Sequence, residues 1–215
     1  MRRATSNKRL QRTAGFAVCT LKRHIVSCRS VKVIPRELGL SFQIDTNRIN
    51  ARSGLAAMNR LEGWRREGLI EILLSEPAQH EATVDGNVAR VRKAYSYIAS
   101  LDTFRSPEET TQENKVEEIL FPGGVRTASE RSDVRIVAHA LKYCCILITA
   151  DGGSRRQPGG ILGHRSELAN QLGVKVMTDE EAVLLVAQKI RDRDEAARRL
   201  ASVTGEILPD WIGCD

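Results

Sequence analysis

The organisation of this chain follows from the stretch Ser41-Phe-Gln-Ile-Asp-Thr-Asn-Arg-Ile-Asn50. The stretch predicts a short buried strand that ends at Asp45, then a polar Thr46-Asn47 step before an amphipathic helix. An acidic residue at the carboxyl end of the first strand of an alternating β/α chain lies where open parallel sheets bind their ligands. A second apolar run, residues 144–149, is followed by Asp151. The two strands are therefore expected to bring two carboxylates to one edge of a sheet.

The rest of the chain continues the alternation of strands and helices. Further strands are expected at residues 69–74 and 174–177. Helices are expected at residues 54–66, from Ser75 with that residue as the N-cap, at 87–100, 107–120, 132–143 with Ser132 as the N-cap, 161–172, and from the Thr178 capping box onward. Strands separated by helices of this length pair in parallel through right-handed crossovers. The pattern predicts an α/β fold, a three-layer α/β/α sandwich with a central parallel sheet.

Length and composition limit the kind of protein. A chain of 215 residues is expected to form one domain of roughly 130 to 160 residues with extensions. The five cysteines are odd in number and lack a Cys-x-x-Cys spacing, which indicates reduced thiols in the cytoplasm rather than disulfides or a zinc site. No apolar run reaches the roughly 18 residues that a membrane span needs. We therefore expect a cytoplasmic protein with no membrane segment.

The positive charge is concentrated at the start of the chain. The formal net charge is +6, but residues 1–40 hold ten Lys and Arg residues against Glu37 alone, so the remainder is mildly acidic. Residues 1–38 also lack a sustained periodic pattern. Two interpretations stay open: a disordered basic extension without a specific role, or an electrostatic tether to nucleic acid.

Four acidic residues form the candidate chemical centre. Each is expected at or just beyond the carboxyl edge of the sheet: Asp45, Glu81, Asp133 and Asp151. Carboxylates that converge on one pocket either raise one another's pKa values or require a cation. Oxygen ligands without His or Cys favour Mg²⁺ or Mn²⁺ over zinc. Such an ion can activate water and clamp the oxygens of a phosphodiester.

Each acid also has an ordinary structural interpretation. Asp133 could simply cap a helix and favour its dipole, and Asp151 before two glycines could form a turn. Glu81 could be a solvated helix residue, with Glu76 as a rival for its place. Asp45 is the hardest to explain in this way, because an acid directly after a buried strand needs a partner.

Basic residues near these acids are candidates for binding the phosphates of a substrate. Two follow Asp45 and two follow Asp151: Arg48, Arg52, Arg155 and Arg156. A solvated loop is the alternative for each pair. Three dispersed histidines are interpreted as surface or packing residues rather than ligands or bases: His80, His139 and His164.

Taken together, these motifs resemble those of PIN-domain nucleases over about residues 42–189. The matching motifs are Asp45-Thr-Asn47 after a strand, a Glu in the helix after the second strand, Ser-Asp133-x-x-Ile-x-x-x-Ala, Leu-Ile-Thr149-x-Asp151, and the run from Gly173 to Ala182. The resemblance implies a metal-dependent endoribonuclease, often the toxin of a toxin–antitoxin pair. It makes Asp45, Glu81, Asp133 and Asp151 catalytic metal ligands, with Asn47 and Thr149 as supporting residues. Where the family often has a further acid or an aromatic residue, this chain has Gly152-Gly153-Ser154.

The resemblance also divides the chain. Residues 1–38 form the basic extension, residues 39–190 the PIN-like nuclease domain, and residues 191–215 the end of the last helix and a tail. The expected substrate is RNA, and an antitoxin protein or a second copy in a homodimer are the partners left open. The alternative function is a non-catalytic PIN-like module that binds RNA or a protein.

Overall fold

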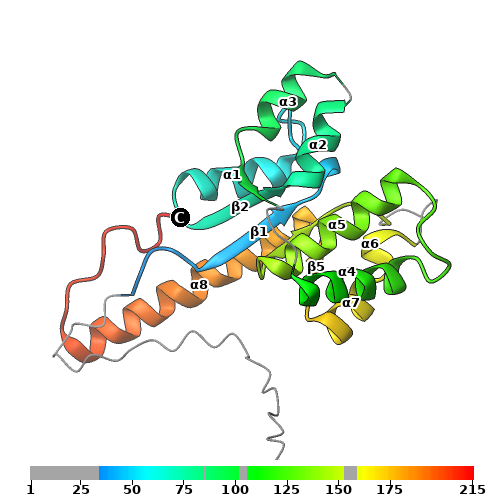
Figure 1. Ribbon diagram of the computed structural model, residues 1–215. Coiled ribbons are helices and arrows are strands. Elements are labelled where there is room, and N and C mark those ends of the chain that lie inside the picture. Colours follow the sequence, from blue (N-terminus) through cyan, green and yellow to red (C-terminus); the bar gives the residue numbers. More distant parts are fainter. Residues whose placement is uncertain (1–33, 85, 102–105, 153–158) are drawn as a thin grey trace, which may run out of the picture. The chain divides into compact units, whose positions relative to one another are not determined.

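The computed structural model of this protein describes residues 34–84, 86–101, 106–152 and 159–215. Within these residues, five strands form one parallel sheet in the order β3-β2-β1-β4-β5 (Figure 1). The elements are β1 (Leu40–Ile44), the short 3₁₀ helix η1 (Thr46–Arg48), α1 (Ala56–Arg66), β2 (Ile70–Ser75), α2 (Glu76–Val84), α3 (Val88–Ala94), β3 (Ile98–Ser100), α4 (Pro107–Leu120), α5 (Ala128–Lys142), β4 (Ile146–Ile148), α6 (Gly160–Gly163), α7 (Arg165–Leu172), β5 (Val176–Met177) and α8 (Asp179–Thr204). The predicted α/β fold with a central parallel sheet is confirmed.

The strand order changes direction at β1. The chain moves from β1 outward to β2 and β3, then returns to the other side of β1 to form β4 and β5. Right-handed crossovers in opposite directions place α1 and the pair α4 and α5 on opposite faces of the sheet. Helix α1 packs with α8, and α5 packs with α4 and α2. The reversal between β1 and β4 is the topological switch point, where parallel sheets of this kind open a crevice at their carboxyl edge.

Strand β1 is the centre of the core. Phe42 and Ile44 are fully buried, and so is the polar residue between them, Gln43. The Gln43 side chain donates a hydrogen bond from Nε2 to the backbone oxygen of Ile136 at 2.7 Å. This bond ties the strand that ends at Asp45 directly to helix α5.

Two predicted helices differ from the structure. The helix expected over residues 87–100 ends at Ala94, and residues 98–100 instead form the edge strand β3 beside residues 73–75 of β2. Helix α5 begins at Ala128 rather than at Ser132, because Thr127 and Glu130 form a capping box that satisfies the first amides four residues earlier. The prediction that Ser132 caps this helix was therefore wrong. The capping box at Thr178 and the N-cap at Asn87, whose side chain accepts from the Arg90 amide, agree with the expected helix starts.

The two ends of the described domain meet on α8. Arg193 is buried, and its guanidinium bonds to the Arg36 backbone oxygen at 2.6 Å and to the Asp215 carboxylate at 2.7 Å. The Arg36 side chain also pairs with Asp215. The ring of Trp211 lies under the Arg193 guanidinium, 4.4 Å from ring centre to Cζ. The tail after α8 therefore packs against the domain through charged and aromatic contacts. No helix among the described residues has the length and apolar character needed to cross a membrane.

Candidate functional site

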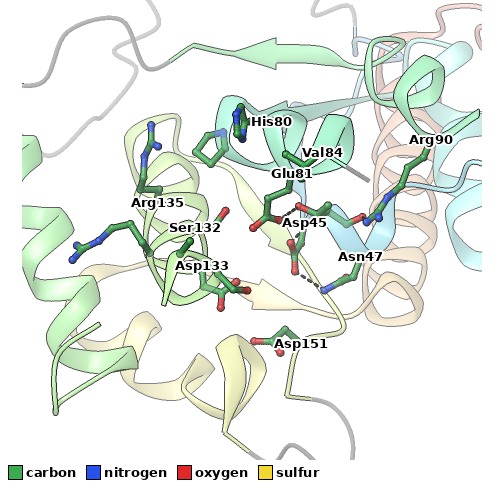
Figure 2. Close-up of a pocket in the computed structure, with 15 residues that line it drawn as sticks. Asp45, Asn47, His80, Glu81, Val84, Arg90, Ser132, Asp133, Arg135 and Asp151 are labelled. Carbon is green, nitrogen blue, oxygen red and sulfur yellow. Dashed lines mark hydrogen bonds between the residues drawn. The ribbon is translucent and has the colours of Figure 1, made fainter. Parts of the chain in front are cut away.

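A pocket of about 750 Å³ opens at the carboxyl ends of β1 and β4, between α2 and α5. Figure 2 shows the carboxylates of Asp45, Glu81 and Asp133 turned toward its centre, with Asp151 below them. The described residues that line it are Asp45, Thr46, Asn47, Pro77, His80, Glu81, Val84, Arg90, Ala128, Ser129, Arg131, Ser132, Asp133, Arg135 and Asp151. The structure thus brings all four predicted acids into one pocket, although they come from four separate segments.

Asp45 is the most buried of the four, with 3% of its surface exposed. Its Oδ1 accepts from the Thr46 amide at 2.5 Å, and its Oδ2 accepts from Asn47 Nδ2 at 2.5 Å and Thr149 Oγ1 at 2.6 Å. Burial raises the pKa of this carboxyl, and these hydrogen bonds offset only part of the rise. A carboxylate offers about four lone-pair positions, so one position of Oδ1 stays available to a ligand in the pocket.

Asn47 and Thr149 connect the ends of β1 and β4 around this carboxylate. Asn47 donates to Asp45 and accepts from the Ala150 amide at 3.1 Å. Thr149 is fully buried, and its hydroxyl also accepts from the Asp151 amide at 2.9 Å. Their predicted supporting role agrees with these contacts, because both side chains fix the orientation of acidic residues in the pocket.

Helix α2 supplies the second acid. Glu81 accepts a hydrogen bond at Oε2 from the Thr46 hydroxyl at 2.6 Å, which couples this helix to the turn after β1. Glu76, the rival for this position, is exposed and is not among the described lining residues. These contacts favour Glu81 over Glu76 as the acid that helix α2 contributes to the pocket.

Asp133 lies in the second turn of α5, one helical turn before Ile136, whose carbonyl is fixed by Gln43. None of the described residues donates a hydrogen bond to the Asp133 carboxyl. Burial and then the charges of Asp45, Asp151 and Glu81 raise its pKa to about 8. Asp133 does not cap this helix, because Thr127 is the N-cap. The pKa of Asp133 is therefore raised first by burial and then by the other acids of the pocket.

Two glycines surround the fourth acid, Asp151. Its Oδ2 accepts from the Ile161 amide at 2.8 Å, and its backbone oxygen accepts from the Leu162 amide at 2.9 Å. Gly152 and Gly160 both have positive φ angles, and a Cβ on Gly160 would lie 2.6 Å from Asp151 Oδ2 and 2.5 Å from the Gly152 nitrogen. Only glycine fits this close approach, so the pair fixes the position of the carboxylate.

The donor chemistry of the pocket fits a hard divalent cation in part. Carboxylate oxygens predominate, as Mg²⁺ and Mn²⁺ prefer. However, no group of three or more His, Cys, Asp or Glu side chains within the described ranges is arranged so that it could hold a metal ion. Mg²⁺ commonly uses one or two protein carboxylates and completes its shell with water and substrate phosphate. Asp45 and Asp133 both line the pocket, and the charge of Asp45 has the largest influence of the other acids on the pKa of Asp133.

The two predicted substrate-binding arginines that the structure describes, Arg48 and Arg52, are not among the residues that line the pocket. Arg48 pairs with Asp179 at the start of α8, 3.0 Å from Nη1 to Oδ1, and its Nε donates to the backbone and side-chain oxygens of Asn47. Arg52 is exposed, and neither residue is among the described lining residues. Arg155 and Arg156 lie outside the described residues. Substrate binding by these four residues stays a prediction.

We expect the ion pair between Arg48 and Asp179 to stabilise the fold. Replacing Arg48 with Ala should lower the free energy of unfolding by about 1 to 3 kcal/mol, because the acceptor Asp179 is only 2% exposed and would lose its charged partner. Asp179→Asn should cost a similar amount, and the double variant should be clearly less destabilised than the sum. Urea denaturation of the three variants measures this. If Arg48→Ala instead left stability unchanged and weakened RNA binding, Arg48 would be a substrate contact.

Several lining residues were not anticipated from the sequence. The Thr46 hydroxyl donates a hydrogen bond to Glu81. The lining also includes His80, for which the sequence predicts a surface or packing role. Three arginines complete this set: Arg90, Arg131 and Arg135. A signal for the last two was present, since they flank Asp133 at positions −2 and +2 and stand four residues apart on one helix face. No comparable pattern marks His80 or Arg90.

No protein-family model and no curated protein sequence matches this chain. Among solved structures, the chain aligns with the crystal structure of VapBC2 from Rickettsia felis bound to a DNA fragment from their promoter, at 15% identity over 65% of this chain and 98% of that chain, with a TM-score of 0.41. A likeness of this size does not assign a family or an activity. Any functional assignment therefore has to come from the site itself.

Proposed function

We propose that this protein is a metal-dependent endoribonuclease that hydrolyses RNA phosphodiester bonds at the pocket between α2 and α5. The observation that carries the proposal is the convergence of four acids from four segments on one pocket in which the pKa of Asp133 is raised to about 8. Perturbed carboxyl groups in a cleft are typical of functional sites. The choice of RNA follows from the resemblance of the motifs to those of PIN-domain nucleases.

Asp45 and Asp133 would hold a Mg²⁺ or Mn²⁺ ion, with Glu81 and Asp151 contributing charge around it. When bound, such an ion lowers the pKa of water and neutralises charge on phosphate oxygens. Asp45 is oriented by three hydrogen-bond donors, so its remaining lone pair points in a fixed direction. Asp133 has no such donor among the described residues, which leaves its oxygens available to accept a proton or bind an ion.

The proposal is tested by cleavage of labelled single-stranded RNA and of DNA of the same sequence. We expect cleavage of RNA with Mg²⁺ or Mn²⁺, loss of cleavage in chelator, and recovery when the ion is added in excess. Cleavage that persists in chelator would contradict a metal-dependent mechanism, and preferential cleavage of DNA would contradict the proposed substrate.

A non-catalytic module that binds RNA or a protein is the second candidate. It is favoured by the finding that no three acids of the described ranges are arranged as a ligand set. Such a module should bind the RNA with and without metal ions and cleave it in neither condition. If cleavage is found, the narrower proposal of a toxin predicts growth arrest on expression that a small antitoxin protein encoded nearby relieves.

A further inference from the structure

Positive charge flanks the acidic centre of the pocket on two sides. Arg90, from α3, lies on one side of the acids, and Arg135, from α5, lies on the other (Figure 2). Arg131 stands one helical turn before Arg135 and also lines the pocket. The charge pattern across the pocket is therefore positive, negative and positive.

The arginines are held at these positions in different ways. The Arg90 guanidinium donates from Nη2 to the Thr46 backbone oxygen at 3.0 Å, beside the hydroxyl that binds Glu81. Arg131 forms an ion pair with Glu117 at 2.6 Å, but its side chain is 48% exposed. Surface pairs of this kind are worth at most about 1 kcal/mol. A phosphate could therefore compete with Glu117 for Arg131 at little cost.

The lining also shows what the pocket does not offer. None of the described lining residues is Phe, Tyr or Trp. Proteins that bind single-stranded nucleic acid through its bases use such rings as stacking platforms. With arginines at both sides and no such platform, the pocket is suited to the phosphate backbone rather than to bases.

We propose that Arg90 on one side and Arg131 and Arg135 on the other bind the phosphates that flank the scissile bond of a single-stranded RNA, whatever its bases. The inference rests on the proposed nuclease function and adds to it how the substrate is held. Positive charge beside the acidic centre would offset the repulsion between its carboxylates and the neighbouring phosphates, and these arginines line the same pocket. Recognition of this kind should depend steeply on salt and weakly on sequence.

Binding of a fluorescent single-stranded RNA, measured by anisotropy at several salt concentrations, tests the inference. The measurements use Mg²⁺ and the Asp133→Asn background, which keeps the RNA intact. Arg90→Ala and Arg135→Ala should each weaken binding at least about fivefold at low salt. Each should also reduce the slope of log affinity against log salt by about 0.7. Oligomers of uridine and of cytidine should bind equally.

Two controls separate charge from folding and from general electrostatics. Arg90→Lys and Arg135→Lys keep the charge and should keep the salt slope. Arg199→Ala removes an exposed arginine of α8 outside the pocket lining and should leave binding unchanged. If the Ala variants bind with the wild-type slope while the parent protein cleaves RNA, this inference is wrong and the proposed function stands. If the parent protein neither binds nor cleaves RNA, both are overturned.

Discussion

Replacing Asp133 with asparagine should lower the rate of RNA cleavage by about 10²- to 10⁴-fold and, in chelator, make the protein more stable. Cleavage should fall because the variant loses a carboxylate that would hold the ion, and stability should rise because it loses a buried acid placed among other acids. The pKa of Asp133 is raised to about 8 by burial and by the charges of Asp45, Asp151 and Glu81. The folded protein therefore binds a proton at this site more tightly than the unfolded chain does, and its stability falls as pH rises.

The pH dependence follows from that sign. The contribution of Asp133 is fully present below its ordinary pKa near 4 and is lost as pH rises through about 8. The asparagine variant lacks this loss. In chelator, its free energy of unfolding should therefore exceed that of the wild type by an amount that grows between pH 5 and 8 to about 1 to 3 kcal/mol, discounted for partial solvent exposure. Thermal melting at several pH values measures it. Added Mg²⁺ should raise the melting temperature of the wild type more than that of the variant.

Glu118→Gln provides the matched control, since this acid is exposed on α4 and outside the pocket. It should change neither cleavage nor the pH dependence of stability. An Asp133→Asn protein that cleaves RNA at the wild-type rate would remove Asp133 from the proposed machinery. One that is less stable than the wild type at pH 8 in chelator would show that the carboxyl has a structural partner.

Asp45→Asn should also abolish cleavage, but it should lower stability by about 1 to 3 kcal/mol. The Asp45 carboxylate accepts from three donors, two of them side chains on Oδ2. An amide nitrogen in the place of Oδ2 would face the Nδ2 donor of Asn47. Asn47 cannot turn its amide over without losing the bonds to Ala150 and Arg48 that its Oδ1 accepts. A donor would therefore be left buried without an acceptor.

Denaturation in urea, with cleavage measured on the same preparations, checks this prediction. The informative comparison is between the two Asp→Asn variants, because they remove the same charge from the same pocket and should move stability in opposite directions. Equal stabilisation by both variants would mean that charge repulsion outweighs the hydrogen bonds at Asp45.

Much of the fold could be predicted from the sequence because local patterns and tertiary structure agree there. The composition of strand β1 predicts that it is buried, and the Thr178 capping box predicts the start of α8. Edge strand β3 could not be found in this way. Its three residues follow a helix without a break of Gly or Pro, and their strand structure depends on pairing with residues 73–75 of β2. The error at α5 was avoidable, since Thr127 and Glu130 have the spacing of a capping box.

The candidate site was predictable only in part, for a related reason. Asp45 and Asp151 follow strands, so the topology of a parallel sheet brings them together wherever the intervening helices lie. The positions of Arg90 and His80 depend on how α2 and α3 pack beyond the sheet, which no periodic pattern records. Arg48 shows the opposite case: it is close to Asp45 in sequence, but an ion pair with Asp179 engages its side chain instead.

The close approach of Gly152 and Gly160 has a consequence for protein engineering. The chain leaves the site at one glycine and returns at the other, with their backbones in contact and Asp151 anchored by amides on the return side. A side chain at either glycine would push the two backbones apart and would therefore displace the carboxylate of Asp151. Engineering of this part of the protein should therefore keep both glycines, because a larger residue at either one would move an acid of the pocket.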